Sequence, residues 1–267
     1  MKKKLSLVKV GGALLENEQS RKELLKLFAQ LQGPKVLVHG GGREASRLAE
    51  QLGQPSQLID GRRITDAFQL KIAVMVYAGA VNKQVVAELQ SEACNALGLS
   101  GADGNLIRAQ KRPVKDIDYG WVGDIVEVNA SFLLPLLEQE ISPVICALTH
   151  DGQGQLLNTN ADTIASYLAI ALSEHFELRL MYCFEHAGVL ANRNDPSSFF
   201  PEIWEDQVPD LVEKKIVSEG MRPKLHNGFN ACRGGVQEVW IGSSTMLNSP
   251  NPTGTRLQVK RTKQVPL

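Results

Sequence analysis

The chain has 267 residues, of which 43% are hydrophobic and 22% are charged, as expected for a globular protein and not for a disordered one. Its 29 basic and 29 acidic residues cancel, so the net charge gives no support to a nucleic-acid partner. The four cysteines form no Cys-x-x-Cys pair, and the longest nearly apolar stretch, IAVMVYAGAV, is about half as long as a membrane span. We therefore expect a cytoplasmic protein with reduced thiols and no nucleic-acid or membrane partner.

Strands and helices alternate from the N-terminus. LSLVKVGG predicts a buried strand, and Ser20 followed by Glu23 predicts a capping box at the start of a helix. KVLVH predicts the second strand, and apolar residues at helical spacing over 45–52 predict the next helix. This alternation predicts an α/β fold with a largely parallel sheet.

One long helix is predicted from Thr65 to about Glu92, with a bend at Gly79. It is apolar on more than one face, which favours burial against a partner subunit. Residues 95–128 predict hairpin strands that decorate the sheet. Further strands are predicted in ISPVICAL, LRLMYC, EVWIGS and GTRLQV, and a helix in DTIASYLAIALS. The sequence has no repeat or linker, so we expect both halves to share one sheet.

Two glycine turns follow the first two strands, KVGG and HGGG. The chain contains neither G-x-G-x-x-G nor G-x-x-x-x-G-K-[ST]. In a parallel sheet, ligands gather at the carboxyl ends of strands, and the helix N-termini that follow favour anions. Lys9 lies two residues before one of these turns, so it is a candidate phosphate-binding charge, although a strand-end lysine can also simply reach solvent.

Three further segments carry polar side chains suited to a small anionic substrate. In LLNTNADTIA, Asn158, Asn160 and Asp162 lead into a helix, and Asp162 taken alone can simply be the N-cap of that helix. In SEGMRPKLHNGF, Lys224 taken alone is most simply a surface lysine. In DGRRIT, two adjacent arginines can bind a carboxylate or remain solvated at the helix start.

Taken together, KVGG, VHGGG, GRRIT, LLNTNAD, EGMRPK and GTRL resemble the amino-acid kinase family. They occur in the family's order and span almost the whole chain. The N-x-N-A-D and G-M-x-x-K elements favour the branch that phosphorylates N-acetyl-L-glutamate over relatives that act on aspartate, carbamate or UMP. The resemblance implies an open three-layer αβα sandwich in a single domain, with an acyl-glutamate-binding and dimerisation half at 1–173 and an ATP-binding half at 174–267.

The implied reaction transfers the γ-phosphoryl group of ATP to the side-chain carboxylate of an N-acylated glutamate, the second step of the acetylated route to arginine. Mg²⁺ would arrive with ATP, so no metal site on the protein is expected. The resemblance implies stabilisation of the phosphoryl group by Lys9 and Lys224, with Asp162 holding both lysines. It also implies phosphate binding by Gly11 and Gly12, and substrate binding by Gly41, Gly42, Arg63, Asn158 and Asn160.

The nucleotide side departs from the family pattern. Where the family has a Ser-Asp-x-x-Gly turn, this chain has YCFEHAGVL. Nucleotide contacts are therefore expected around Glu185, Gly188, Val189 and Leu190 in an altered adenine pocket.

Two expectations concern assembly and substrate. The chain starts a few residues before its first strand, without the N-terminal helix of arginine-inhibited relatives, so we expect an unregulated homodimer that associates through residues 65–92. Two alternatives remain open: a kinase for N-succinyl-L-glutamate, and a non-catalytic ligand-binding relative.

Overall fold

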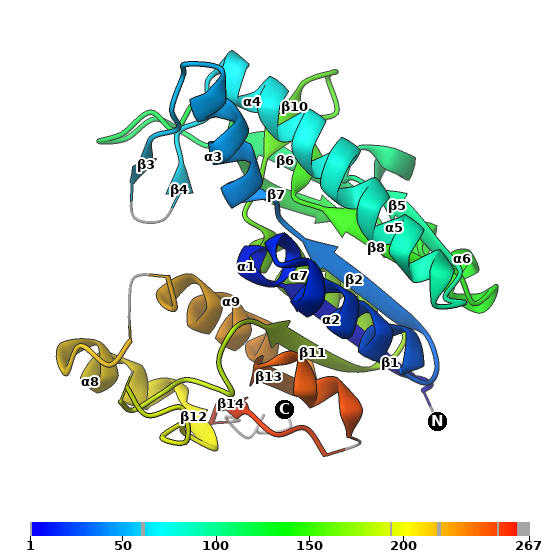
Figure 1. Ribbon diagram of the computed structural model, residues 1–267, viewed down its shortest axis with the longest axis vertical. Coiled ribbons are helices and arrows are strands. Elements are labelled where there is room, and N and C mark those ends of the chain that lie inside the picture. The colour runs from blue at the N-terminus through cyan, green and yellow to red at the C-terminus, as the bar shows by residue number, and fades with distance from the viewer. Residues whose placement is uncertain (1, 60–61, 193, 218–219, 250, 261–267) are drawn as a thin grey trace, which may run out of the picture.

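The computed structural model describes residues 2–59, 62–192, 194–217, 220–249 and 251–260. An eight-stranded sheet with the order β12-β14-β13-β11-β1-β2-β8-β5 forms its centre (Figure 1). All neighbouring strands in it are parallel except β13 and β14, which confirms the predicted α/β class. The strands are β1 (Lys4–Val10), β2 (Lys35–His39), β5 (Ala96–Leu99), β8 (Ser142–Cys146), β11 (Glu177–Cys183), β12 (Glu202–Trp204), β13 (Glu238–Gly242) and β14 (Thr255–Gln258).

Both halves of the chain contribute to this sheet, as predicted. Strands β5, β8, β2 and β1 come from residues 1–173, strands β11 to β14 come from the remainder, and the two groups meet at the β1–β11 pair. The ends of β1 and β11 therefore bring residues far apart in sequence to one edge.

Two smaller sheets lie outside the main one. A four-stranded sheet has the order β10-β9-β6-β7, with β6 (Ile107–Lys111), β7 (Gly123–Val128), β9 (Leu148–His150) and β10 (Leu156–Asn158), and β3 (Leu58–Ile59) pairs with β4 (Arg62–Arg63). The predicted hairpin character of residues 95–128 is confirmed for the antiparallel pair β6–β7. It is wrong for β5, which joins the main sheet as a parallel edge strand.

The helices are α1 (Gly12–Glu16), α2 (Glu18–Gln30), α3 (Gly42–Gln51), α4 (Ala67–Ala73), α5 (Asn82–Ser91), α6 (Leu134–Glu138), α7 (Ala161–Ser173), α8 (Val208–Glu213) and α9 (Arg222–Arg233). The predicted capping box at Ser20 is wrong. Helix α2 begins at Glu18, and the side chain of Asn17 caps it by accepting a hydrogen bond from the Ser20 backbone N–H at 2.9 Å. Ser20 thus supplies the donor in this cap and not the acceptor.

The predicted long helix exists as one continuous run over residues 67–91, built from α4, the π-helical segment η1 (Val74–Val81) and α5. Asp66 caps it by accepting from the Gln69 N–H at 2.7 Å. Gly79 lies inside the π-helical segment. By length and composition alone, this helix could cross a membrane, contrary to the estimate from its apolar stretch. The core helix of a soluble protein passes the same test of length and composition.

Alternation along the strands assigns side chains to the two faces of the main sheet. Leu5 and Leu7 of β1 pack in one hydrophobic cluster with α7 and α9. Val8 and Val10, with Leu37 of β2, pack in a second cluster with α2 and α5. Lys9 consequently shares the α7 face, whereas His39, two residues after Leu37, shares the α5 face.

Candidate functional site

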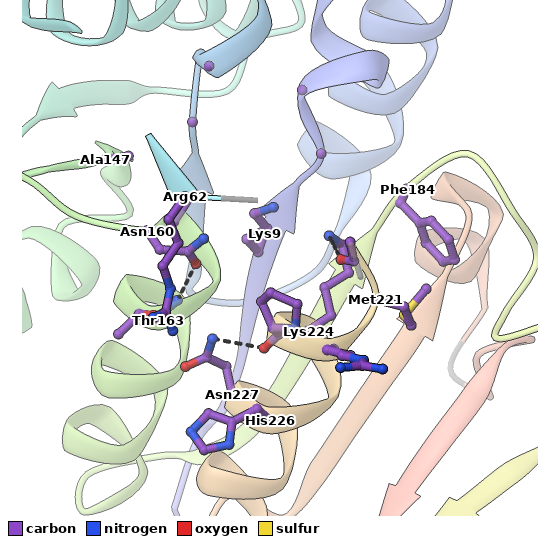
Figure 2. A pocket seen from close by; sticks show the side chains of 18 of the residues that line it. Lys9, Arg62, Ala147, Asn160, Thr163, Phe184, Met221, Lys224, His226 and Asn227 are labelled. Carbon is purple, nitrogen blue, oxygen red and sulfur yellow. Dashed lines mark hydrogen bonds between the residues drawn. The ribbon is translucent and has the colours of Figure 1, made fainter. Parts of the chain in front are cut away.

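A cleft of ≈ 1260 Å³ opens at the carboxyl ends of β1, β2 and β11. Residues from both halves of the chain line it, including every residue in the predicted site except Asp162. Figure 2 shows Lys9 on its central strand and Lys224 on helix α9, with Phe184 farther along the cleft. The arrangement agrees with the rule that ligands bind at this edge of a parallel sheet.

Asp162 lies in the first turn of α7 behind the cleft, and two lysines converge on its carboxylate. The Nζ of Lys9 is 2.6 Å from Oδ1, and the Nζ of Lys224 is 3.5 Å from Oδ2. All three side chains are largely buried, with exposed fractions of 9% for Lys9, 17% for Lys224 and 5% for Asp162. Each carboxylate oxygen of Asp162 therefore faces one ammonium group, with Lys9 the nearer of the two.

Burial and charge act in opposite directions on this cluster. Burial alone would raise the pKa of Asp162, but Lys9 and Lys224 outweigh it and hold that pKa below its ordinary value. Burial lowers the pKa of Lys9, and Lys224 adds to this effect, while the Asp162 carboxylate opposes it. The carboxylate therefore keeps a desolvated ammonium charged next to a second one.

Asn160, and not Asp162, caps α7. Its side-chain oxygen accepts from the backbone N–H groups of Asp162 at 2.9 Å and Thr163 at 3.1 Å. The open alternative that Asp162 is only an N-cap is therefore wrong. Because the cap occupies the Asn160 oxygen, this side chain has only its amide N–H groups left to offer a substrate.

The two glycine turns differ in the N–H groups they offer. The Gly11 N–H donates to the Cys183 carbonyl at 2.9 Å, so the donor expected to bind phosphate is already engaged. Gly12 begins α1. In the second turn, Gly41 precedes α3 and Gly42 begins it, and in the described part of the chain neither N–H has a protein acceptor. The second turn is thus the better supplied with free donors.

Arg63 is committed to holding the second turn. Its Nη2 donates to the Gly42 carbonyl at 2.6 Å and to Ser46 Oγ at 2.7 Å, and its Nη1 donates to Ser56 Oγ and Gln69 Oε1. Both terminal nitrogens are therefore engaged, although the residue lines the cleft. The neighbouring Arg62 is exposed, lines the same cleft and has no ion pair within the described residues.

Asn158, the last residue of β10, is held by side-chain and backbone contacts. Its amide donates to Thr65 Oγ1 at 3.0 Å, and its backbone forms a bridge to Val122. Arg112 follows β6, and its N–H donates to the Val122 carbonyl at 2.8 Å. The Arg112 guanidinium binds the Asp124 carboxylate through Nη2 at 2.6 Å and Nε at 3.1 Å. Its Nη1 is buried and has no partner within the described residues.

The predicted nucleotide residues line the opposite end of the cleft. Glu185 is exposed there, whereas Gly188, Val189 and Leu190 are buried. A Cβ at Gly188 would lie 2.6 Å from Thr255 Oγ1, so only glycine fits that position. Phe184 and His186, which were not predicted, stack edge to face at 5.5 Å between ring centres. They place an aromatic surface at the position of the Ser-Asp turn that the family pattern has and this chain lacks.

Two buried side chains under the second turn were also missed. His39 is fully buried, and Tyr77 packs against Gly41 so closely that a Cβ there would lie 2.6 Å from Tyr77 Cδ1. The one sequence signal for His39 is its place directly before the three glycines. Tyr77 lies inside the apolar run and carries no such signal.

Within the described ranges, no group of three or more His, Cys, Asp or Glu side chains is arranged to hold a metal ion. The described carboxylates beside the cleft are Asp124 and Asp162, each paired with a basic side chain, and exposed Glu185.

Comparison with known proteins gives consistent results. A sequence model described as the amino acid kinase family matches residues 4–243. A protein of Phocaeicola vulgatus named acetylglutamate kinase is 51% identical over 253 residues, covering 95% of this chain and 98% of that protein. A protein of the same name from Methanopyrus kandleri is 38% identical, covering 89% of this chain and 94% of that protein.

Solved structures agree in fold. An N-acetylglutamate synthase from Neisseria gonorrhoeae has a TM-score of 0.79 at 24% identity and covers 96% of this chain, which corresponds to 59% of that protein. A carbamate kinase from Giardia has a TM-score of 0.67 at 14% identity, covering 97% of this chain and 99% of that one. At these identities, the likeness supports the three-layer α/β architecture alone.

Proposed function

Because the chain belongs to the amino-acid kinase family, we propose that it transfers the γ-phosphoryl group of ATP to the γ-carboxylate of N-acetyl-L-glutamate. Relatives that are 50–52% identical to this chain over nearly their whole length are named acetylglutamate kinase. The product is an acyl phosphate, which serves arginine synthesis.

In the reaction, a carboxylate oxygen of the substrate forms a bond to the γ-phosphorus as the bond to the ADP oxygen breaks. No proton needs to move, because the carboxylate is already ionised at neutral pH. The obstacle is negative charge on both reactants and on the transferring group. Lys9 and Lys224 neutralise that charge from two sides, and the free N–H groups of Gly41 and Gly42 add oriented donors.

The observation that carries the proposal is the convergence of Lys9 and Lys224, from opposite halves of the sequence, on the Asp162 carboxylate. Two ammonium groups and one carboxylate leave a net positive charge beside the cleft, and burying such a charge costs free energy unless a further anion is bound there. The same convergence argues against a non-catalytic relative. The test is ADP release from Mg·ATP with N-acetyl-L-glutamate, with L-glutamate and L-aspartate as control acceptors. The assignment would be overturned if ADP formed only with the control acceptors, or if it formed as fast when no acceptor was added.

For substrate binding, we propose that Arg62, together with Asn158, binds the α-carboxylate, while Arg63 shapes the turn. Since both terminal nitrogens of Arg63 are engaged, the substrate contact that the family resemblance implies for Arg63 would have to use its Nε. Replacing Arg62 by Leu should raise the KM for N-acetyl-L-glutamate and leave the KM for ATP unchanged.

For the nucleotide, we propose that Mg²⁺ would arrive with ATP and would offset phosphate charge, without a dedicated set of protein ligands among the described residues. The adenine ring would lie near Phe184, Gly188 and Val189. A cytoplasmic location follows from this biosynthetic role and stays a prediction.

One observation favours a second acceptor, N-succinyl-L-glutamate. Buried Arg112 Nη1 lacks a partner in the described part of the chain, whereas the rest of its guanidinium is fixed by Asp124. An unpartnered buried donor is costly, and an acyl group that ends in a carboxylate would satisfy it. An acetyl group offers only its carbonyl oxygen.

Comparing kcat/KM for the N-acetyl and N-succinyl substrates tests this second candidate. The variant Arg112→Met should lower kcat/KM for the succinyl substrate by ~10- to 100-fold, the scale of a charged hydrogen bond. It should change the value for the acetyl substrate much less. Equal loss for both substrates would remove the case for succinyl selectivity.

We also propose that the protein is a homodimer through the 67–91 helix. Only 39% of the helix's most apolar 18-residue window is buried, and Met75 on it is 45% exposed. Met75→Glu should convert a dimer to a monomer in light scattering after gel filtration. Val126→Glu, at a similarly exposed position on β7, is the matched control and should leave the mass unchanged.

A further inference from the structure

His39 is a fully buried histidine at the end of β2, and the phosphoryl-transfer scheme above gives it no part. Its Nδ1 lies 2.7 Å from the Gly40 carbonyl oxygen, and its Nε2 lies 3.0 Å from the amide nitrogen of Asn82. Both ring nitrogens are therefore engaged, one with the glycine turn and one with the first residue of α5.

The partners of Asn82 determine which ring nitrogen carries the proton. The Asn82 amide nitrogen also donates to the Val144 carbonyl at 2.9 Å, and its Oδ1 accepts from Lys83 Nζ at 3.2 Å. Since that nitrogen can only donate, His39 Nε2 must accept, and the ring proton lies on Nδ1. Nδ1–H then donates to the Gly40 carbonyl. Burial, assisted by nearby Lys9, lowers the pKa of His39 to about 4, so the ring is neutral at physiological pH.

The orientation of the next peptide follows from this bond. The Gly40 carbonyl and the Gly41 N–H belong to one trans peptide and point in opposite directions. His39 holds the carbonyl from the α5 face of the sheet, whereas Lys9 and Asp162 lie on the α7 face. The Gly41 N–H therefore points toward the lysines and the cleft. A flipped peptide, which glycine readily permits, would instead present a carbonyl oxygen to an anion.

The long helix supports the turn at a second point. Tyr77 packs on Gly41, and Asn82, five residues after Tyr77 in the helix, contacts His39. In an ordinary α-helix, residues five apart are rotated by about 140° from each other. The π-helical segment between Val74 and Val81, with its i to i+5 bonds, brings residues at this spacing to the same side.

We propose that His39, oriented by Asn82, is a positioning residue that fixes the Gly40–Gly41 peptide so that the Gly41 N–H faces the transferring phosphoryl group. This inference rests on the proposed kinase function. It assigns to the π-helical segment the task of presenting Tyr77 and Asn82 to the turn together.

The test compares three variants by steady-state kinetics. His39→Leu removes the donor, and His39→Asn offers an amide N–H in place of Nδ1–H. His175→Leu, at an exposed position outside the cleft, is the matched control. His39→Leu should lower kcat by ~10- to 100-fold, near the lower end of the effect of losing an oriented donor. Its KM for ATP should stay within about threefold, while His39→Asn should recover most of the lost turnover.

Equal turnover in His39→Leu and the wild type would overturn the inference, as would an equal loss in His39→Leu and His39→Asn. The wild-type assay with N-acetyl-L-glutamate is run first, because its failure refutes the proposed function and not this inference. If His39→Leu does not fold, ¹⁵N NMR of the wild-type histidine ring decides. A proton on Nδ1 at pH 7 supports the inference, and a proton on Nε2 contradicts it.

Discussion

Replacing Asp162 by Asn removes the negative charge that pairs with two buried ammonium groups. With an effective dielectric constant of about 20, the Asp162 carboxylate attracts Lys9 at 2.6 Å by about 6 kcal/mol and Lys224 at 3.5 Å by about 5 kcal/mol. Desolvation offsets much of this attraction. The expected net loss in unfolding free energy is therefore ~3–5 kcal/mol, the scale seen when one partner of a buried pair is removed.

The same substitution should change the pH dependence of turnover in a defined direction. Burial already lowers the pKa of Lys9, and Asp162 is the main group that opposes this effect. Without the carboxylate, Lys9 loses its proton at lower pH, and with it the positive charge that stabilises the transferring group. We expect kcat to fall by ~10²–10⁴ and the alkaline limb of the pH profile to move to lower pH.

Steady-state kinetics between pH 6 and pH 10 and urea unfolding at pH 7 measure both effects. Asp124→Asn is the matched control, because Asp124 also lies beside the cleft and pairs with a basic side chain but does not contact the lysines. An unmoved alkaline limb in Asp162→Asn, with kcat near that of the wild type, would refute the electrostatic reasoning.

Two further predictions concern stability. Gly41→Ala should destabilise the fold by ~1–3 kcal/mol, because its Cβ would lie 2.6 Å from Tyr77 Cδ1. Gly12→Ala should destabilise it much less, because nothing lies within 4 Å of a Cβ at that position. Equal losses of stability in thermal unfolding would contradict this steric account. In the folded protein, the pKa of Asp162 lies below its unfolded value of about 4, so its stabilisation is present above that pH and is lost as pH falls through the folded pKa. The free energy of unfolding, measured with urea, should therefore fall less between pH 6 and pH 3 in Asp162→Asn than in the wild type. The same fall in both proteins would exclude this contribution.

The sequence was sufficient to predict the sheet and the residues gathered at its edge. Strand-to-helix alternation predicts parallel strands, and parallel strands bring their carboxyl ends together, so Lys9 and the second glycine turn were expected side by side. The approach of Lys224 to Asp162 could not be derived from spacing, because residues 62 positions apart meet only through the packing of α9 on α7. The family resemblance supplied that expectation.

Hydrogen-bond partners were the least predictable feature. Gly11 and Gly41 both follow strands. The Gly11 N–H donates to the neighbouring strand, whereas the Gly41 N–H has no protein acceptor within the described residues. Arg62 and Arg63 are adjacent arginines, and the first is exposed while the second is buried because they occupy opposite faces of a two-residue strand. His39 was overlooked because its role depends on Asn82, 43 residues away on another element. Such partners follow from tertiary packing, which local sequence does not specify.

The central claim is that Lys9 and Lys224 together stabilise the phosphoryl group during transfer. The most direct measurement is the affinity for ADP, aluminium fluoride and N-acetyl-L-glutamate, which together mimic that group, in Lys9→Ala and Lys224→Ala. Each variant should bind the mimic ~10²–10⁴ times more weakly than the wild type, bind ADP alone nearly normally, and lose kcat by the same factor. Wild-type affinity for the mimic in either variant would contradict the claim.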